Sequence, residues 1–253
     1  RRCLVGSEMC IRDSYHPDFD ALEAHVTENT KAIILNTPNN PTGAVYTPEE
    51  TQRLVDFAVK HDLWILDDMI YSTLVWTDVG YTSPCAFEGG SERTITIGGW
   101  SKGWAMTGWR LGWITGPTNV MDGVKVVNVS SATHVPTFLM PAAAKALSLE
   151  EEVQEMKDAF AERRVLMHQG LSSLPGFVVP EPEGAFYILC DITGTGLTDI
   201  EFAHQALEHA QVQVIPGSLM KGGDGLIRIS YATSIANIHE GVGRLRKWLE
   251  SRR

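Results

Sequence analysis

The stretch TITIGGWSKGWAMTGWRLG, residues 94–112, decides how the chain folds around it. Its first four residues alternate Thr and Ile, and such a β-branched run is typical of a short strand. Two glycines end this strand, and the pair Ser101–Lys102 follows one residue later. An unpaired ammonium group is costly to bury. A lysine at the end of an apolar strand therefore indicates either a solvated loop or a chemical role.

Other apolar runs of the same kind alternate with helix signals. Residues 32–35 and 63–66 form apolar runs that end in polar residues, and residues 111–114 form another. Between the first two, Thr47-Pro48-Glu49-Glu50 predicts a helix start, because Thr suits the cap, Pro the first helical position and Glu the third. Strands that alternate with helices predict an α/β fold with a mainly parallel sheet.

The pattern changes after about residue 136. Residues 150–173 predict one long helix, which Pro175-Gly176 ends. We expect a larger, mainly parallel domain at residues 15–149, then this connecting helix and a smaller α+β domain at residues 150–253. In the smaller domain, strands are expected near 177–179, 185–189, 212–215 and 226–230, and helices near 199–210 and 235–250.

Composition excludes several classes of partner. The 253 residues are 43 % hydrophobic, and 21 Lys+Arg against 31 Asp+Glu give a formal charge of −10. That charge argues against nucleic acid or an anionic membrane surface, and no apolar run approaches the roughly 20 residues of a membrane helix. The four cysteines lack metal-ligand spacing and are too few for a disulfide framework. We therefore expect a cytoplasmic protein without a metal site.

The first 14 residues, RRCLVGSEMCIRDS, differ from the rest. They have neither the apolar core nor the cleavage site of a signal peptide. The stretch is similar to the read-through product of a sequencing adapter, so we expect residues 1–14 to be a non-native or disordered leader. The alternative is a short, poorly ordered native terminus.

Polar residues that could carry chemistry follow the ends of three predicted strands. Ligands of open α/β sheets bind at the carboxyl edge of the strands. Together these residues predict one site at that edge. They are Asn40, Asp68, Tyr71, Ser101 and Lys102.

Four blocks of sequence resemble the signatures of the class I/II aminotransferases, which are pyridoxal 5′-phosphate (PLP) enzymes of fold type I. They occur in the order of that family, the third block is highly specific, and the resemblance spans about residues 15–250. It implies a large domain, incomplete here, and a small C-terminal domain. The blocks are 39–43 (NNPTG), 68–71 (DMIY), 101–112 (SKGWAMTGWRLG) and 227–230 (IRIS).

The resemblance implies roles for residues at the ends of the strands. Lys102 would form a Schiff base with PLP, yield it to the substrate amine and then move the substrate proton. Asp68 would keep the pyridine nitrogen of PLP protonated. Its spacing to Tyr71 selects it over the adjacent Asp67. Tyr71 and Asn40 would bind the phenolic oxygen of PLP, and the peptide bond after Asn40 is expected to be cis.

Two arginines complete the implied site. Arg110 would bind the PLP phosphate with Ser101 or a nearby hydroxyl, because a guanidinium fork suits phosphate. Gly99 stands where many members have Ser or Thr, so that hydroxyl is missing or supplied by Ser101. Arg228 lies on a mostly apolar strand, and the substrate α-carboxylate would be its anion, with Asn40 beside it. An ion pair is the alternative for each arginine. Residues 184–187 (GAFY) resemble the wall of the substrate pocket.

The implied function is that of an aminotransferase (EC 2.6.1) that moves an amino group between an L-amino acid and a 2-oxo acid. The blocks lean towards aspartate-type enzymes, which work as homodimers. Alternatives on the same fold are a C–S lyase, a decarboxylase or a cyclopropane-forming synthase, since these share Lys102, Asp68 and Arg228. A further alternative is the aminotransferase-like effector domain of a regulator, although nothing here is basic enough for a DNA-binding module.

The resemblance also implies missing parts. In the family, the region before residue 15 supplies a helix start that holds the phosphate, an aromatic ring on the pyridine, and residues that read the substrate side chain. None is visible in this sequence. We therefore expect an N-terminally truncated enzyme that binds PLP weakly or not at all and turns over poorly.

Overall fold

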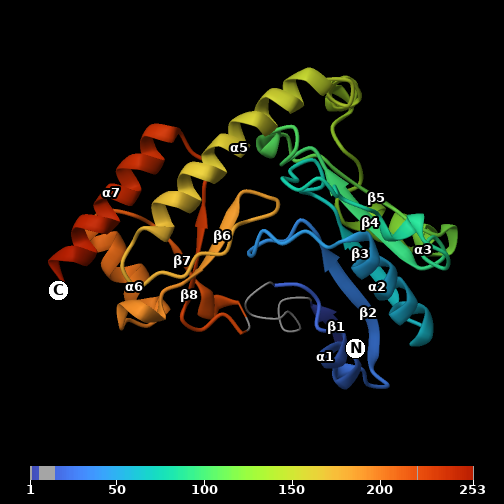
Figure 1. Cartoon of the computed structure of the whole chain (residues 1–253). Helices are drawn as coiled ribbons and strands as arrows, with labels where there is room; N and C mark the ends of the chain where they lie inside the picture. Colours follow the sequence, from blue (N-terminus) through green and yellow to red (C-terminus); the bar gives the residue numbers. More distant parts are fainter. Residues whose placement is uncertain (1, 6–14, 221, 253) are drawn as a thin grey trace.

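The computed structural model describes residues 2–5, 15–220 and 222–252, and two sheets organise them (Figure 1). One sheet has five strands in the order β1-β2-β3-β4-β5, and the other has three in the order β6-β8-β7. The first five strands are β1 Arg2–Val5, β2 Thr30–Asn36, β3 Trp64–Asp68, β4 Thr94–Gly99 and β5 Gly112–Thr115. The other three are β6 Tyr187–Asp191, β7 Ile215–Pro216 and β8 Leu226–Ser230.

The five-stranded sheet is mainly parallel, as the sequence predicts. β1 to β4 pair in parallel, and β5 pairs antiparallel to β4. Asn36 pairs with Asp68, and Asp68 pairs with Ile97, so the carboxyl ends of β2, β3 and β4 lie level with one another. The prediction of an α/β fold with a mainly parallel sheet is confirmed.

Helices cover these sheets. The capping box predicted at Thr47 is confirmed: its Oγ1 accepts the Glu50 N–H at 3.2 Å, and Glu50 Oε2 accepts the Thr47 N–H at 2.8 Å. The predicted long helix is also confirmed; it packs against α7 and runs between the two groups of elements in Figure 1. The helices are α1 Phe19–His25, α2 Pro48–Lys60, α3 Thr118–Ser131, α4 Met140–Ala146, α5 Glu150–Ser172, α6 Asp199–Gln205 and α7 Ile235–Ser251.

The C-terminal elements follow the sequence less closely. The strand expected at 177–179 is wrong: Val178 forms only an isolated bridge with Asp191. Of the strand expected at 212–215, only Ile215 lies in a strand, the two-residue β7 Ile215–Pro216. The helix expected at 199–210 ends at Gln205 and continues as one π-helical turn, Ala206–Ala210. In segments this short, the spacing of apolar residues gives only a weak indication of secondary structure, which explains these differences.

A second group of differences concerns residues 118–146, where α3 and α4 were not predicted. Several large apolar side chains there face solvent, among them Val126 at 68 % and Phe138 at 78 % exposure. Contiguous exposed apolar surface is typical of an interaction site. None of the helices in the described ranges is long and apolar enough to cross a membrane.

The start of the chain is described only in part. Residues 2–5 form β1 and pair with β2, whereas residues 6–14 lie outside the described residues. The non-native leader at 1–14 and the domain boundary near 149 remain predictions.

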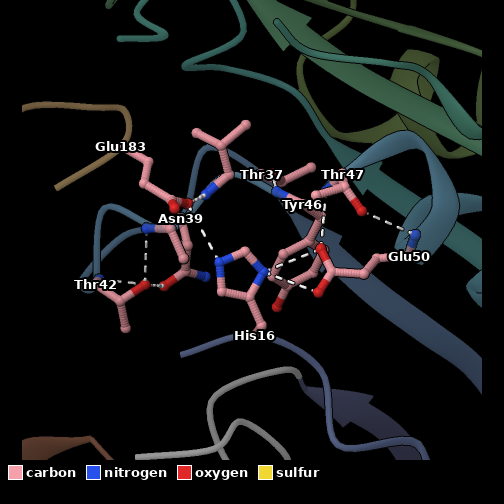
Figure 2. Close-up of polar contacts among 10 residues, drawn as sticks. His16, Thr37, Asn39, Thr42, Tyr46, Thr47, Glu50 and Glu183 are labelled. Atoms are coloured by element: carbon pink, nitrogen blue, oxygen red, sulfur yellow. Dashed lines mark hydrogen bonds and ion pairs between the residues drawn. The ribbon is translucent and has the colours of Figure 1, made fainter. Parts of the chain in front are cut away.

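A histidine that precedes α1, His16, bridges the two halves of the chain (Figure 2). The His16 ring lies between two carboxylates: Nδ1 is 2.9 Å from Glu50 Oε1, and Nε2 is 3.3 Å from Glu183 Oε2. Glu50 caps α2, and Glu183 lies between α5 and β6. Glu183 Oε2 also accepts the Val45 N–H at 2.8 Å. The bridge therefore joins the N-terminal segment, α2 and the C-terminal half.

Two carboxylates at opposite ring nitrogens favour the imidazolium form, in which both nitrogens donate. The bond to Glu183, helped by Glu50 and opposed by burial, raises the pKa of His16 from 6.5 to about 9. Burial raises the pKa of Glu183, but hydrogen bonds from His16 and Val45 more than offset it, and the pKa is lowered overall. Both members of the pair are thus charged at neutral pH.

We predict that His16→Gln weakens the fold in a pH-dependent way. Because the folded pKa of about 9 exceeds the ordinary 6.5, the stabilisation is complete below pH 6.5 and disappears as the pH rises through 9. The variant should lose about 1–2 kcal/mol of unfolding free energy at pH 6 and almost none above pH 9, measured by urea denaturation. The exposed His25, at the end of α1, provides the matched control His25→Gln. An equal loss at both pH values would contradict the bridge.

Candidate active site

One asparagine ties the end of β2 and the loop that follows it to the end of β3. Asn36 Nδ2 donates to the carbonyl oxygen of Asp68 at 3.0 Å, and Asn36 Oδ1 accepts the N–H of Asn40 at 2.8 Å. The Asn40–Pro41 peptide bond is cis, as the resemblance implied. The side chain of Asn36 thus holds the loop after β2 against the end of β3.

Lys102 follows β4 and reaches towards two aromatic rings. Its Nζ lies 5.9 Å from the ring centroid of Tyr71 and 5.5 Å from that of Phe186. The chain turns tightly behind the lysine, since a Cβ on Gly103 would lie 2.3 Å from Thr73 Oγ1. Lys102 is half-buried, and the two aromatic rings beside it come from both halves of the chain. It is therefore not a freely solvated loop lysine.

The two adjacent aspartates at the end of β3 have different surroundings, because successive side chains of a strand point to opposite faces. Asp67 is fully buried, and its Oδ2 accepts the Tyr81 hydroxyl at 2.6 Å and the Thr96 hydroxyl at 3.4 Å. Burial raises the pKa of Asp67 to about 6, against the effect of these bonds. Asp67 thus belongs to a separate cluster with Tyr81.

Asp68 points the other way and is half-buried. Burial also raises the pKa of its carboxyl group, and the Ile70 N–H, 3.4 Å from Oδ1, opposes that rise. Within the described ranges no cation forms an ion pair with Asp68. A partly buried carboxylate without a cation favours a positively charged or protonated ligand group.

Arg228 on β8 joins this edge through Asn40. Its Nη1 donates to Asn40 Oδ1 at 2.9 Å, and its guanidinium lies 4.9 Å from the ring centroid of Tyr187. The hydroxyl of Tyr187 lies 3.3 Å from that of Tyr71. Burial, and then the contact with Tyr187, raise the pKa of Tyr71 well above its ordinary value. A continuous chain of contacts through Tyr187 therefore connects four of the predicted site residues: Asn40, Tyr71, Lys102 and Arg228.

Two predicted residues are not connected to that set. Arg110 is exposed, and its Nη1 donates to the carbonyl oxygen of Thr107 at 2.8 Å. Among the described residues, no hydrogen bond joins Ser101 or Arg110 to Lys102, so their role at a phosphate remains a prediction. Close packing explains why position 99 is a glycine: a Cβ there would lie 2.8 Å from the Leu111 carbonyl oxygen. A Ser or Thr at this position would force the β4–β5 pair apart.

Sequence reasoning missed one residue, Asn36, and expected two others, Phe186 and Tyr187, only as part of the pocket wall. Asn36 ends an apolar strand, as Asp68 does, and that position was an available signal. Phe186 and Tyr187 lie in the segment expected only as pocket wall, yet one contacts Lys102 and the other contacts Arg228 and Tyr71. These long-range contacts have no signature in the local sequence.

Comparison with known proteins places this geometry in a family. The family model described as aminotransferase class I and II matches residues 6–245. The chain belongs to this family. Its members use PLP, and the prediction of a fold-type-I PLP transferase is confirmed.

Individual relatives agree with this assignment. The chain is 40 % identical to an aspartate aminotransferase of Pyrococcus abyssi over 95 % of its own length and 63 % of the relative's. It is 42 % identical to aromatic-amino-acid aminotransferase 2 of Thermococcus litoralis, covering 92 % and 61 %. The structure of an aromatic aminotransferase from Pyrococcus horikoshii superposes with a TM-score of 0.92 at 39 % identity, covering 95 % and 65 %. The chain thus spans less than two thirds of each relative.

The side chains at this edge fit PLP chemically. A primary amine suits the aldehyde, and a carboxylate without a cation suits the pyridinium nitrogen. Phenol and amide groups suit the phenolic oxygen. Lys102, Asp68, Tyr71 and Asn40 provide these groups, and Arg228 adds a donor for a carboxylate.

We predict that Asp67→Asn stabilises the protein at neutral pH. Because the folded pKa of Asp67, about 6, exceeds the ordinary 3.8, the folded state holds an extra proton between these values and stability falls as the pH rises through them. The variant should gain about 1–2 kcal/mol of unfolding free energy at pH 8, and the gain should vanish near pH 4. Asp122→Asn, at an exposed position of α3, is the control. A loss of stability at pH 8 would show that the Tyr81 bond outweighs the cost of burial.

Proposed function

We propose that the full-length protein is a PLP-dependent aminotransferase that exchanges the amino group of an L-amino acid with a 2-oxo acid. The observation that carries the proposal is the grouping of Lys102, Tyr71, Asn40 and Arg228 at one sheet edge, with Asp68 at the end of the central strand. The names of the relatives support amino-group transfer over lyase or decarboxylase chemistry.

The residues divide the work by their chemistry. When bound, PLP supplies an electron-accepting ring next to the reacting carbon. Lys102 would hold the cofactor through its aldehyde, and its amine, once free, would carry the proton released from the substrate Cα. Asp68 holds the proton on the pyridine nitrogen, because its carboxylate favours the charged form.

The remaining groups orient the reactants. Tyr71 and Asn40 donate to the phenolic oxygen, which stabilises its negative charge. Arg228 binds the substrate α-carboxylate through its planar fork of donors. Ser101 and Arg110 bind the phosphate in the complete protein.

The proposal extends to the assembly and location of the protein. The exposed apolar side chains of residues 126–140 support a homodimer of the full-length chain, since such surface favours association. Cys85 and Cys190 are free, which supports a reducing compartment such as the cytoplasm. The relatives' names support an aspartate or an aromatic amino acid as the amino donor.

The adjacent aspartates give a sharp test. In the full-length protein, Asp68→Asn should lower the transamination rate by about a hundredfold or more, the scale expected for loss of a preorganised electrostatic partner. Asp67→Asn is the matched control, one residue away and on the other face of the sheet, and should keep nearly the wild-type rate. A stopped assay of the 2-oxo acid product measures both. Equal losses in the two variants would overturn the assignment of Asp68.

The covalent role of Lys102 has its own test. Borohydride reduction of the full-length protein with PLP, followed by peptide mass spectrometry, should find the pyridoxyl group on Lys102. Lys102→Ala should lose this label and the absorbance band of bound PLP, together with about a thousandfold or more of the rate. Lys125→Ala, on the exposed α3, should keep all three. A label on another lysine would refute the proposed function.

A further inference from the structure

Tyr187 contacts both ends of the candidate site. It begins β6, pairs with Ser230 of β8, and is only 9 % exposed. Its hydroxyl lies 3.3 Å from the hydroxyl of Tyr71, and its ring lies 4.9 Å below the guanidinium of Arg228. Its position therefore links the group proposed to bind the substrate carboxylate to the group proposed to bind the phenolic oxygen.

The ring of Tyr187 limits how Arg228 can turn. A guanidinium has five N–H donors in one plane, and the described contacts of Arg228 use one of them, on Asn40 Oδ1 at 2.9 Å. The aromatic face holds the plane of the guanidinium from one side through a cation–π contact, worth about 0.5–2 kcal/mol. With one edge on Asn40 and one face on Tyr187, the other donors have a fixed direction, as a bidentate carboxylate contact requires.

The hydroxyls of Tyr187 and Tyr71 lie within hydrogen-bonding distance, and either of them could be the donor. In a pair of hydroxyls, one donates and the other accepts. If Tyr71 donates to a ligand oxygen, Tyr187 must be the donor to Tyr71. That donation polarises the Tyr71 hydroxyl and strengthens its own hydrogen bond to the ligand.

We propose that Tyr187 is a positioning residue: its ring orients Arg228 towards the substrate carboxylate, and its hydroxyl donates to Tyr71, which directs the Tyr71 proton to the cofactor. This inference rests on the proposed function. It assigns two separable tasks to one side chain, one to the ring and one to the hydroxyl. A tyrosine that only fills the core would perform neither.

Two variants of the full-length holoenzyme separate these tasks. Tyr187→Phe keeps the ring, so the KM for the amino acid should stay within about twofold, while the pH midpoint of the PLP absorbance change should rise by about half a unit or more. Tyr187→Leu removes the ring as well, so KM should rise about tenfold, the loss of a cation–π contact of about 1.4 kcal/mol. The Kd of a non-reactive dicarboxylate, measured by calorimetry, should rise in parallel.

Tyr231→Phe is the matched control. Tyr231 is fully buried in the same core, but its hydroxyl donates to the Ala185 carbonyl oxygen at 3.0 Å and accepts from Trp76 Nε1 at 3.1 Å. Loss of this hydroxyl should lower the unfolding temperature without moving KM or the absorbance midpoint. Tyr187 variants that behave like Tyr231→Phe in all three measurements would overturn the inference.

The outcomes also distinguish the inference from the function beneath it. If Lys102→Ala abolishes the PLP band while Tyr187→Leu leaves KM and Kd unchanged, only the positioning role is refuted. If the band survives Lys102→Ala, the proposed function fails, and the positioning role fails with it.

Discussion

The parallel pairing of β2, β3 and β4 is the constraint on which the site depends. Parallel strands bring their carboxyl ends to one edge, and the register of Asn36, Asp68 and Ile97 brings three of them to the same height. The residues that follow each strand therefore lie near one another although they are distant in sequence. Asn36 strengthens this edge because its side chain bonds both to the end of β3 and to the loop that carries Asn40. Loss of this register by one residue would send every side chain of a strand to the other face.

The C-terminal half, which carries Arg228, is fastened to the loop after β2. The N–H groups of Glu183 and Gly184 both donate to the Gly43 carbonyl oxygen, at 2.9 and 2.7 Å. A Cβ on Gly43 would lie 2.7 Å from Pro182, and its φ of +79° also favours glycine, so this contact needs the residue that is present. His16 adds a charged bond to Glu183 at the same junction. The fastening of the two halves and the position of Arg228, the group proposed to bind the substrate carboxylate, thus depend on one short loop.

The sequence predicted those elements that are determined by residues close together in the chain. The capping box at Thr47, the strands at 30–36 and 94–99 and the long helix at 150–172 each follow from residues close in the chain. The grouping of Asn40, Asp68, Tyr71 and Lys102 followed from the carboxyl-edge rule. Three features could not be predicted in this way: the two-residue β7, the bridge from His16 to Glu183, and the double contact of Tyr187. Each depends on which distant segments meet, and no local spacing encodes that.

The adjacent aspartates show how one strand can separate two uses of the same chemical group. Asp67 and Asp68 have the same side chain and the same strand end, and burial raises the pKa of both. Their surroundings differ because successive side chains of a strand point to opposite faces. The carboxyl group of Asp67 accepts hydrogen bonds from Tyr81 and Thr96, whereas that of Asp68 has no cation among the described residues. A buried carboxylate that lacks a cation lowers stability unless a ligand supplies the positive charge. The free energy that Asp68 costs the unliganded fold is recovered when such a ligand binds, which couples binding at this edge to stability.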